Sequence, residues 1–158
     1  MKTIYGLACV TSLALLSGCG GGSTTTGPTK TADSFLAGTW AGTVTIQRAG
    51  MPDTIAPTEW VFAPMPKTGG AGYQATATIR DGWLPVTVTM TTSAIPPAPG
   101  ATVRSSGNYD SPRGCKGIFG SDGTATADRF TGTIDGVDCL QLPAPSTFRG
   151  TVTLSKSR

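Results

Sequence analysis

"GTWAGTVTIQ", residues 38–47, alternates between two kinds of side chain, and this alternation decides the fold class. In an extended segment, successive side chains point to opposite faces. Trp40, Val44 and Ile46 then share one face, and threonines occupy most of the other face. One apolar face and one polar face predict a half-buried β-strand.

The same period of two recurs along the chain. Four further segments repeat it, and the threonines of their polar faces suit a pleated, solvated surface. These segments are residues 72–80, 84–91, 130–134 and 148–154. Further strands are expected near 59–63, 102–109, 115–119 and 124–127. No stretch after residue 35 shows helical spacing over ten residues, so we predict an all-β fold of eight or nine antiparallel strands.

Glycine and proline mark the expected connections. Asp81-Gly82 and Asp122-Gly123 have the composition of tight hairpin turns, and Asp135 also precedes a glycine, as in a turn. The proline clusters at 64–66, 96–99 and 143–145 predict loops.

Strands with a single apolar face must close on themselves or pack against a second sheet. Because the expected connections are short, we predict an up-and-down barrel, with a β-sandwich as the alternative. A membrane-spanning barrel would present its apolar side chains outward. We disfavour that class because the apolar face holds several small residues and few aromatics.

The opening strand resembles the first strand of the calycin barrels, the group that contains lipocalins and avidins. The resemblance rests on Gly38-Thr39-Trp40 and on the strand pattern. It implies that Trp40 closes one end of the barrel and that a basic residue near the end of the last strand packs across it. Lys156 and Arg158 are the candidates. The polar residues of a biotin site cannot be placed here, so biotin binding is not carried over.

Four aromatic residues are candidates for the barrel end or for lining a ligand cavity: Trp40, Trp60, Phe62 and Trp83. An eight-stranded barrel has an interior wide enough for side chains or for one small ligand. These aromatics therefore either fill the interior or line a cavity, and sequence leaves both possibilities open.

The N-terminus carries a different signal. Lys2 precedes an apolar stretch of 13 residues, Ile4 to Leu16, which is too short to span a bilayer but suits a signal peptide. Leu16-Ser17-Gly18-Cys19 follows and resembles the lipobox of bacterial lipoproteins. The resemblance implies that the Cys19 thiol takes a diacylglycerol, that the chain is cut before Cys19 and that the new amine is acylated, with palmitate among the acyl chains.

These features divide the chain into three parts. Residues 1–18 are expected to be the signal peptide, residues 19–34 the lipidated cysteine with a flexible Gly/Ser/Thr linker, and residues 35–158 one β domain. Gly20 stands where an aspartate would resemble an inner-membrane retention signal. We therefore expect attachment to the outer membrane if the cell has one.

Cys115 and Cys139 remain in the expected β domain. An exported chain with an even cysteine count favours a disulfide between them. Zinc is a poor rival because it needs three or four ligands and the chain has no histidine.

Residue types for catalysis are scarce. Without histidine, the usual base that activates a serine is missing, and Asp128, Asp135 and Asp138 lack the calcium-loop spacing. Glu59 is expected to be exposed. Scattered basic residues with a net charge of +3 do not resemble a nucleic-acid footprint. We expect no enzyme, no cofactor and no bound metal, and a monomer.

Two functions remain open. The first is a lipid-anchored barrel that binds a small apolar ligand. The second is a structural or interaction lipoprotein of the cell envelope, with a filled barrel and surface contacts to a partner.

Overall fold

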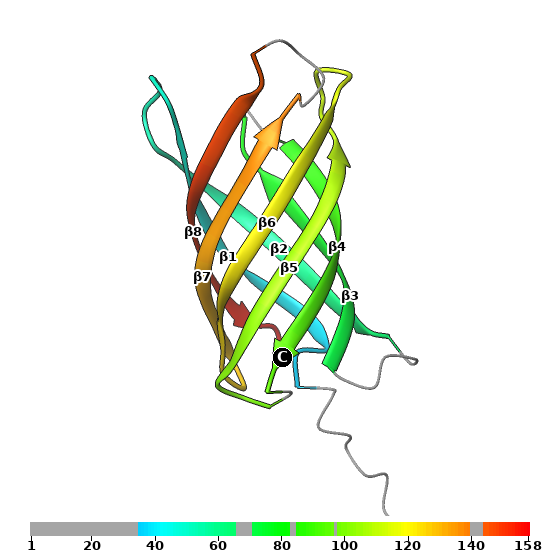
Figure 1. The fold of residues 1–158 in the computed structure, drawn as a ribbon. Helices are drawn as coiled ribbons and strands as arrows, with labels where there is room; N and C mark the ends of the chain where they lie inside the picture. The colour runs from blue at the N-terminus through cyan, green and yellow to red at the C-terminus, as the bar shows by residue number, and fades with distance from the viewer. Residues whose placement is uncertain (1–34, 66–70, 83–84, 97, 140–143) are drawn as a thin grey trace, which may run out of the picture.

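Eight antiparallel strands close into a barrel in the computed structural model, which describes residues 35–65, 71–82, 85–96, 98–139 and 144–158 (Figure 1). The strands are β1 (Gly38–Arg48), β2 (Thr54–Pro64), β3 (Ala71–Arg80), β4 (Pro85–Ile95), β5 (Ala101–Asp110), β6 (Lys116–Ala125), β7 (Arg129–Asp138) and β8 (Ser146–Lys156). Each strand pairs with the next, and β8 returns to pair with β1. The structure confirms the prediction of an all-β up-and-down barrel and not the sandwich alternative.

The barrel has eight strands, although nine strand segments were predicted, because two of those segments form one continuous strand. The segments expected at 115–119 and 124–127 are parts of β6, and Asp122-Gly123 lies inside that strand rather than in a turn. Gly123 pairs with Gly132 of β7, where the two backbones approach so closely that a Cβ on Gly123 would lie 2.5 Å from the Thr131 carbonyl oxygen. Glycine serves this close approach.

The other turn predictions had mixed outcomes. Asp135-Gly136 lies within β7, so the prediction of a turn there is wrong. Asp81-Gly82 does lie in the connection from β3 to β4. The expected strand residue Leu84 lies outside the described residues.

β2 begins at Thr54, five residues before the predicted segment, and contains Pro57. It pairs with β3 only from Thr58 onward, so Pro57 does not interrupt that ladder.

The connections gather at two ends of the barrel. We call the end where the described chain begins, at Phe35, the proximal end, and the opposite end the distal end (Figure 1). β2, β4 and β6 end at the proximal end, where β3, β5 and β7 begin. β1, β3, β5 and β7 end at the distal end, where β2, β4, β6 and β8 begin.

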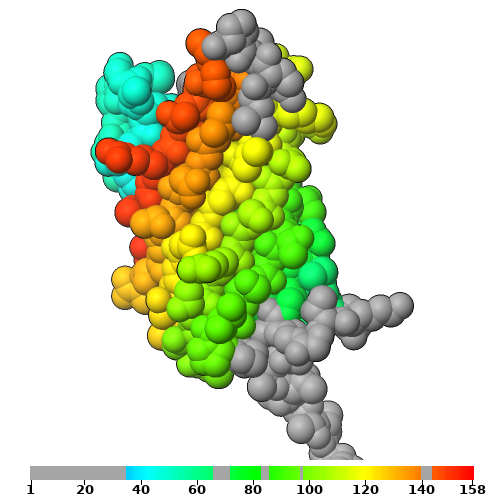
Figure 2. Space-filling view, in the orientation of Figure 1, coloured from blue at the N-terminus to red at the C-terminus, as the bar shows by residue number. Residues whose placement is uncertain are grey.

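Inward and outward positions alternate as the period of two predicts. Apolar side chains fill the inside, and the largest of the fully buried ones belong to Trp40, Trp60, Tyr73, Phe62, Phe119 and Phe130. The outer wall of β5 to β8 faces the viewer in Figure 2. Threonine recurs on it, for example where Thr131 lies beside Thr153. The described residues include no helix that is long and apolar enough to cross a membrane.

Closure depends on a close contact at Gly150. This residue of β8 pairs with Ile46 of β1, and a Cβ built on it would lie 1.7 Å from the Thr45 carbonyl oxygen. No side chain fits there without moving the backbone of β1.

We predict that Gly150→Ala lowers the free energy of unfolding by about 3 kcal/mol or more, since the methyl group must push β8 away from β1. Gly82→Ala is the matched control, because nothing lies within 4 Å of its Cβ position, and we expect a change within about 0.5 kcal/mol. Urea unfolding followed by tryptophan fluorescence measures both. Equal effects of the two substitutions would contradict the close contact.

Candidate functional site

Trp40 closes the proximal end of the barrel. Its side chain is fully buried, and its Nε1 donates a hydrogen bond to the Leu36 carbonyl oxygen at 2.7 Å. Lys156 lies beside Trp40 in register, with its Nζ 5.4 Å from the centre of the ring, and also donates to the Phe35 carbonyl oxygen at 2.6 Å. The basic residue that the resemblance placed across Trp40 is therefore Lys156. The hydrogen bonds to Phe35 and Leu36 hold the entering segment against the barrel, and cation–π attraction keeps Lys156 over Trp40.

Aromatic rings pack against one another inside the barrel. Trp60 and Phe62 point inward from β2, and the Trp60 ring centre lies 5.6 Å from that of Phe130 and 5.9 Å from that of Phe119. Phe62 lies 6.1 Å from Trp60 and 6.3 Å from Tyr73, the latter in an edge-to-face arrangement. These separations are typical of contacting aromatic pairs. Trp60 and Phe62 are therefore held in the core by other rings.

The indole donors inside the barrel are bound by the protein itself. Trp60 Nε1 donates to Thr58 Oγ1 at 3.0 Å, and Thr58 Oγ1 in turn donates to the Thr78 carbonyl oxygen at 2.8 Å. Trp40 and Trp60 thus offer no unused N–H to a ligand. Trp83, the fourth predicted residue of this set, lies outside the described residues.

A row of small hydroxyl side chains interrupts the apolar interior. Thr92 and Ser105 are buried partners on β4 and β5, and their hydroxyl oxygens are 2.8 Å apart. Ser121 of β6 is the next residue along this row, opposite Ser105. Its Oγ is buried and has no hydrogen-bond partner among the described residues.

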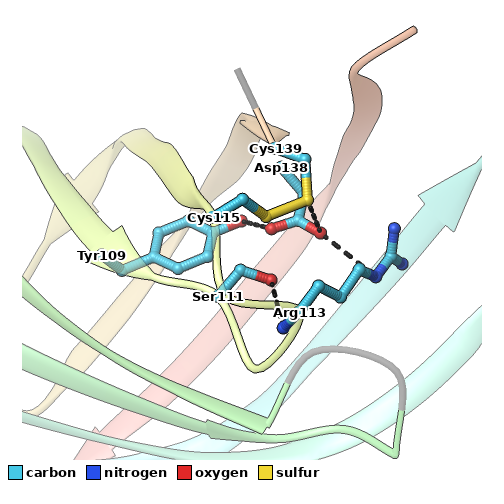
Figure 3. Close-up of a disulfide and its surroundings, with 6 residues drawn as sticks. All are labelled: Tyr109, Ser111, Arg113, Cys115, Asp138 and Cys139. Carbon is cyan, nitrogen blue, oxygen red and sulfur yellow. Dashed lines mark hydrogen bonds and ion pairs between the residues drawn. A yellow bond between two sulfur atoms is a disulfide. The ribbon is translucent and has the colours of Figure 1, made fainter. Parts of the chain in front are cut away.

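The distal end carries the disulfide (Figure 3). Cys115 lies just before β6 and Cys139 just after β7, with their Cα atoms 5.0 Å apart, so the predicted pairing is present in the structure. The carboxylate of Asp138 lies beside the disulfide. It accepts a hydrogen bond from the Tyr109 hydroxyl at 3.1 Å and lies 3.5 Å from Arg113 Nε.

This cluster is held by burial and charge. Asp138 is 1% exposed, so its carboxylate depends on these protein partners in place of water. Burial raises the pKa of Tyr109, and the negative charge of Asp138 and the hydrogen bond to it raise that pKa further. The carboxylate and the two sulfur atoms lie within 4.8 Å of one another. Because the sulfurs are joined to each other, they are not thiolate ligands in this form.

A second buried ion pair lies at the distal end. Arg48 at the end of β1 contacts Asp81 with an N–O distance of 2.8 Å, and both side chains are more than nine-tenths buried. Arg48 also donates to Thr54 Oγ1 at 2.7 Å. Asp81 is therefore more than the turn residue that its neighbour Gly82 suggested. No local pattern predicts this contact, since 33 residues separate the partners.

The remaining candidate residues lie apart. Glu59 is exposed on β2, beside Ala41 and Thr78 of the neighbouring strands. Asp128 lies in the proximal turn between β6 and β7, whereas Asp138 lies at the distal end of β7. Cys19, the predicted lipidation residue, lies outside the described residues.

The hydroxyl row predicts opposite effects for two similar substitutions. Ser121→Ala should raise the free energy of unfolding by about 1 kcal/mol, because it removes a buried hydroxyl without a partner. Ser105→Ala should lower it by about 1 kcal/mol or more, because it leaves the Thr92 hydroxyl unpaired. Chemical denaturation compares the two variants with the parent protein, and a loss of stability in both would contradict the assignment for Ser121.

The Tyr109–Asp138 contact predicts an alkaline loss of stability. A tyrosine in the unfolded chain ionises near pH 10. Tyr109 in the folded protein keeps its proton to higher pH, so the unfolded state then binds fewer protons and stability falls as pH rises above about 10. Tyr109→Phe should cost about 1–2 kcal/mol at pH 7 through the lost hydrogen bond to a carboxylate.

The same variant should show a shallower loss of stability between pH 10 and 11. Thermal unfolding of both proteins at pH 7, 10 and 11 measures this difference. Parallel stability curves would show that Tyr109 does not titrate as its contact with Asp138 implies.

Compared with known proteins, the chain matches no family model, no curated protein and no solved structure. The closed barrel of eight antiparallel strands is compatible with the calycin resemblance.

Proposed function

We propose that this chain is a lipid-anchored protein of the bacterial cell envelope, with a non-catalytic, calycin-like barrel that is filled and acts through its outer surface. The observation that carries the proposal is the packed aromatic interior. Trp60 contacts Phe62, Phe119 and Phe130 at ring separations of 5.6–6.1 Å, in the space where a calycin barrel would hold a ligand.

The two ends of the barrel support the same function. The segment after the predicted linker enters at the proximal end, where Leu36 and Lys156 hold it against Trp40. A lipid on Cys19 would therefore place the proximal end toward the membrane. The distal end, braced by the disulfide and by Arg48–Asp81, would face away from it.

The alternative function is the binding of a small apolar ligand inside the barrel. It is supported by the Trp40–Lys156 closure, which matches the closed end that the calycin resemblance implies, and by the apolar interior. A ligand would have to displace buried side chains such as Phe62 or Met90, both almost fully buried.

Metabolic labelling with an alkyne analogue of palmitate tests the anchor. We expect label on the parent protein and on Cys9→Ser, and none on Cys19→Ser, because Cys19 is the acylated residue. Label retained on Cys19→Ser, together with an intact residue 1–18 segment, would contradict the lipoprotein assignment.

Native mass spectrometry of the lipidated protein from its own host tests the interior. We expect the mass of the acylated polypeptide alone. A reproducible extra mass that leaves on unfolding would favour the ligand-binding alternative and would leave the anchor unaffected.

A further inference from the structure

A hollow lies on the outside of the barrel where β7, β8 and β1 run side by side. Its volume is about 390 Å³, and Gly150 and Ile134 form part of its lining. β8 and β7 are the red and orange strands of Figure 2. Six outward side chains surround the hollow in two rows across the strands. The rows are Asp135–Arg149–Gln47 and Thr133–Thr151–Thr45.

A second hollow of about 480 Å³ continues toward the distal end. It shares Gln47 and Arg149 with the first and adds Asp53 and Thr147. We call the two hollows together the β8 groove. Its length along the strand direction and its open side suit an extended ligand that lies along the surface.

Opposite charges line the β8 groove without pairing. Asp135 and Arg149 are cross-strand neighbours, yet neither makes an ion pair within the part of the chain that the structure describes. The Asp135 carboxylate is turned toward β6, where one of its oxygens lies 3.2 Å from the Cβ position of Gly120. Because Gly120 has no side chain, it leaves room for that carboxylate on the β6 side of β7.

The remaining groups are neutral or already engaged. Gln47 donates to Asp53 at 2.9 Å, which orients its amide and partly satisfies that carboxylate. Thr45 and Thr151 add hydroxyls that can donate or accept. The Thr133 hydroxyl donates to the Asp122 carbonyl oxygen at 3.4 Å and can still accept. The groove thus offers the Arg149 guanidinium and the hydroxyls of Thr45 and Thr151, with the Asp135 carboxylate at its edge nearest β6.

This combination selects a ligand class. An anion would meet Asp135 and Asp53, and a cation would meet Arg149, so a singly charged ligand gains at one group and loses at another. A sugar hydroxyl accepts from a guanidinium and donates to a carboxylate, so a neutral polyhydroxylated chain satisfies both.

We propose that the β8 groove binds a neutral glycan chain. This inference deepens the proposed function, because it names a ligand for the outer surface of a filled barrel. It rests on that proposal, since a protein of the cell envelope would meet the glycan polymers of the envelope. The interaction would leave the interior unchanged.

Nuclear magnetic resonance of the mature protein tests the groove residue by residue. The probes are a tetrasaccharide of β-1,4-linked N-acetylglucosamine, maltotetraose, inorganic phosphate and a neutral tetrapeptide, each to about 20 mM, a range that detects weak millimolar binding. We expect one of the oligosaccharides to shift the backbone amide signals of residues 45–47, 133–135 and 149–151. Phosphate and the peptide should not.

Three variants sharpen the test. Arg149→Gln and Asp135→Asn should each weaken oligosaccharide binding by about fivefold or more, through a lost charge-assisted hydrogen bond. Gly120→Val should weaken it too, because the new side chain pushes the Asp135 carboxylate toward Arg149. Arg129→Gln, which removes an exposed arginine at the proximal end of β7, is the matched control and should change binding by less than about twofold.

Several outcomes would overturn the inference. These are no shift with either oligosaccharide, shifts with phosphate or the peptide alone, or equal effects of Arg149→Gln and Arg129→Gln. If an oligosaccharide instead shifts the signals of inward residues such as Trp60 and Phe62, the barrel is hollow. In that case the proposed function, a filled barrel, fails together with the groove. The other outcomes overturn the groove alone and leave the filled barrel standing.

Discussion

The pairing of β1 with β8 is the interaction on which the rest of the structure depends. It runs from Trp40 opposite Lys156 to Arg48 opposite Phe148 and removes the two free sheet edges that an open meander of eight strands would have. The same register places Lys156 over the Trp40 ring and brings Arg149 between Gln47 and Asp135. Closure of the barrel thus positions the residues of both the proximal end and the β8 groove. Gly150 permits closure because it lets the backbones of β1 and β8 approach each other.

Once the barrel is closed, the size of its interior limits what the inward side chains can be. β2 supplies Trp60 and Phe62, whereas the inward positions of β5 include Ala101, Val103 and Ser105. Large side chains on some strands are matched by small ones on others, as expected for a small barrel filled by its own residues. The interior hydroxyls follow from the same limit, since serine and threonine occupy little more space than alanine and valine.

Alternation along the chain predicted the all-β class, because period two directly reports which side of a strand is buried, and the short expected connections predicted the barrel. Trp60 and Phe62 were expected to fill the interior or line a cavity, and both lie inside the barrel. The calycin resemblance implied a basic residue over Trp40. Topology narrowed it to Lys156 or Arg158, since an eight-stranded meander brings its last strand beside its first. The merging of two predicted strands into β6 was missed because Asp122-Gly123 has the composition of a turn. Arg48–Asp81 and the Asp135–Arg149 row were beyond prediction, because they depend on strand register and on the direction in which each side chain leans.

The disulfide links the two ends of the β6–β7 hairpin. Cys115 and Cys139 bracket β6 and β7, and these two strands are already joined by the turn at the proximal end. The hairpin is therefore a covalent ring. Neither of its strands can leave alone to pair with the same strand of a neighbouring molecule, because the ring would have to open first. Exchange of identical elements between copies of one protein is a low-cost route to dimers. A ring of this kind confines such exchange to strands outside the hairpin.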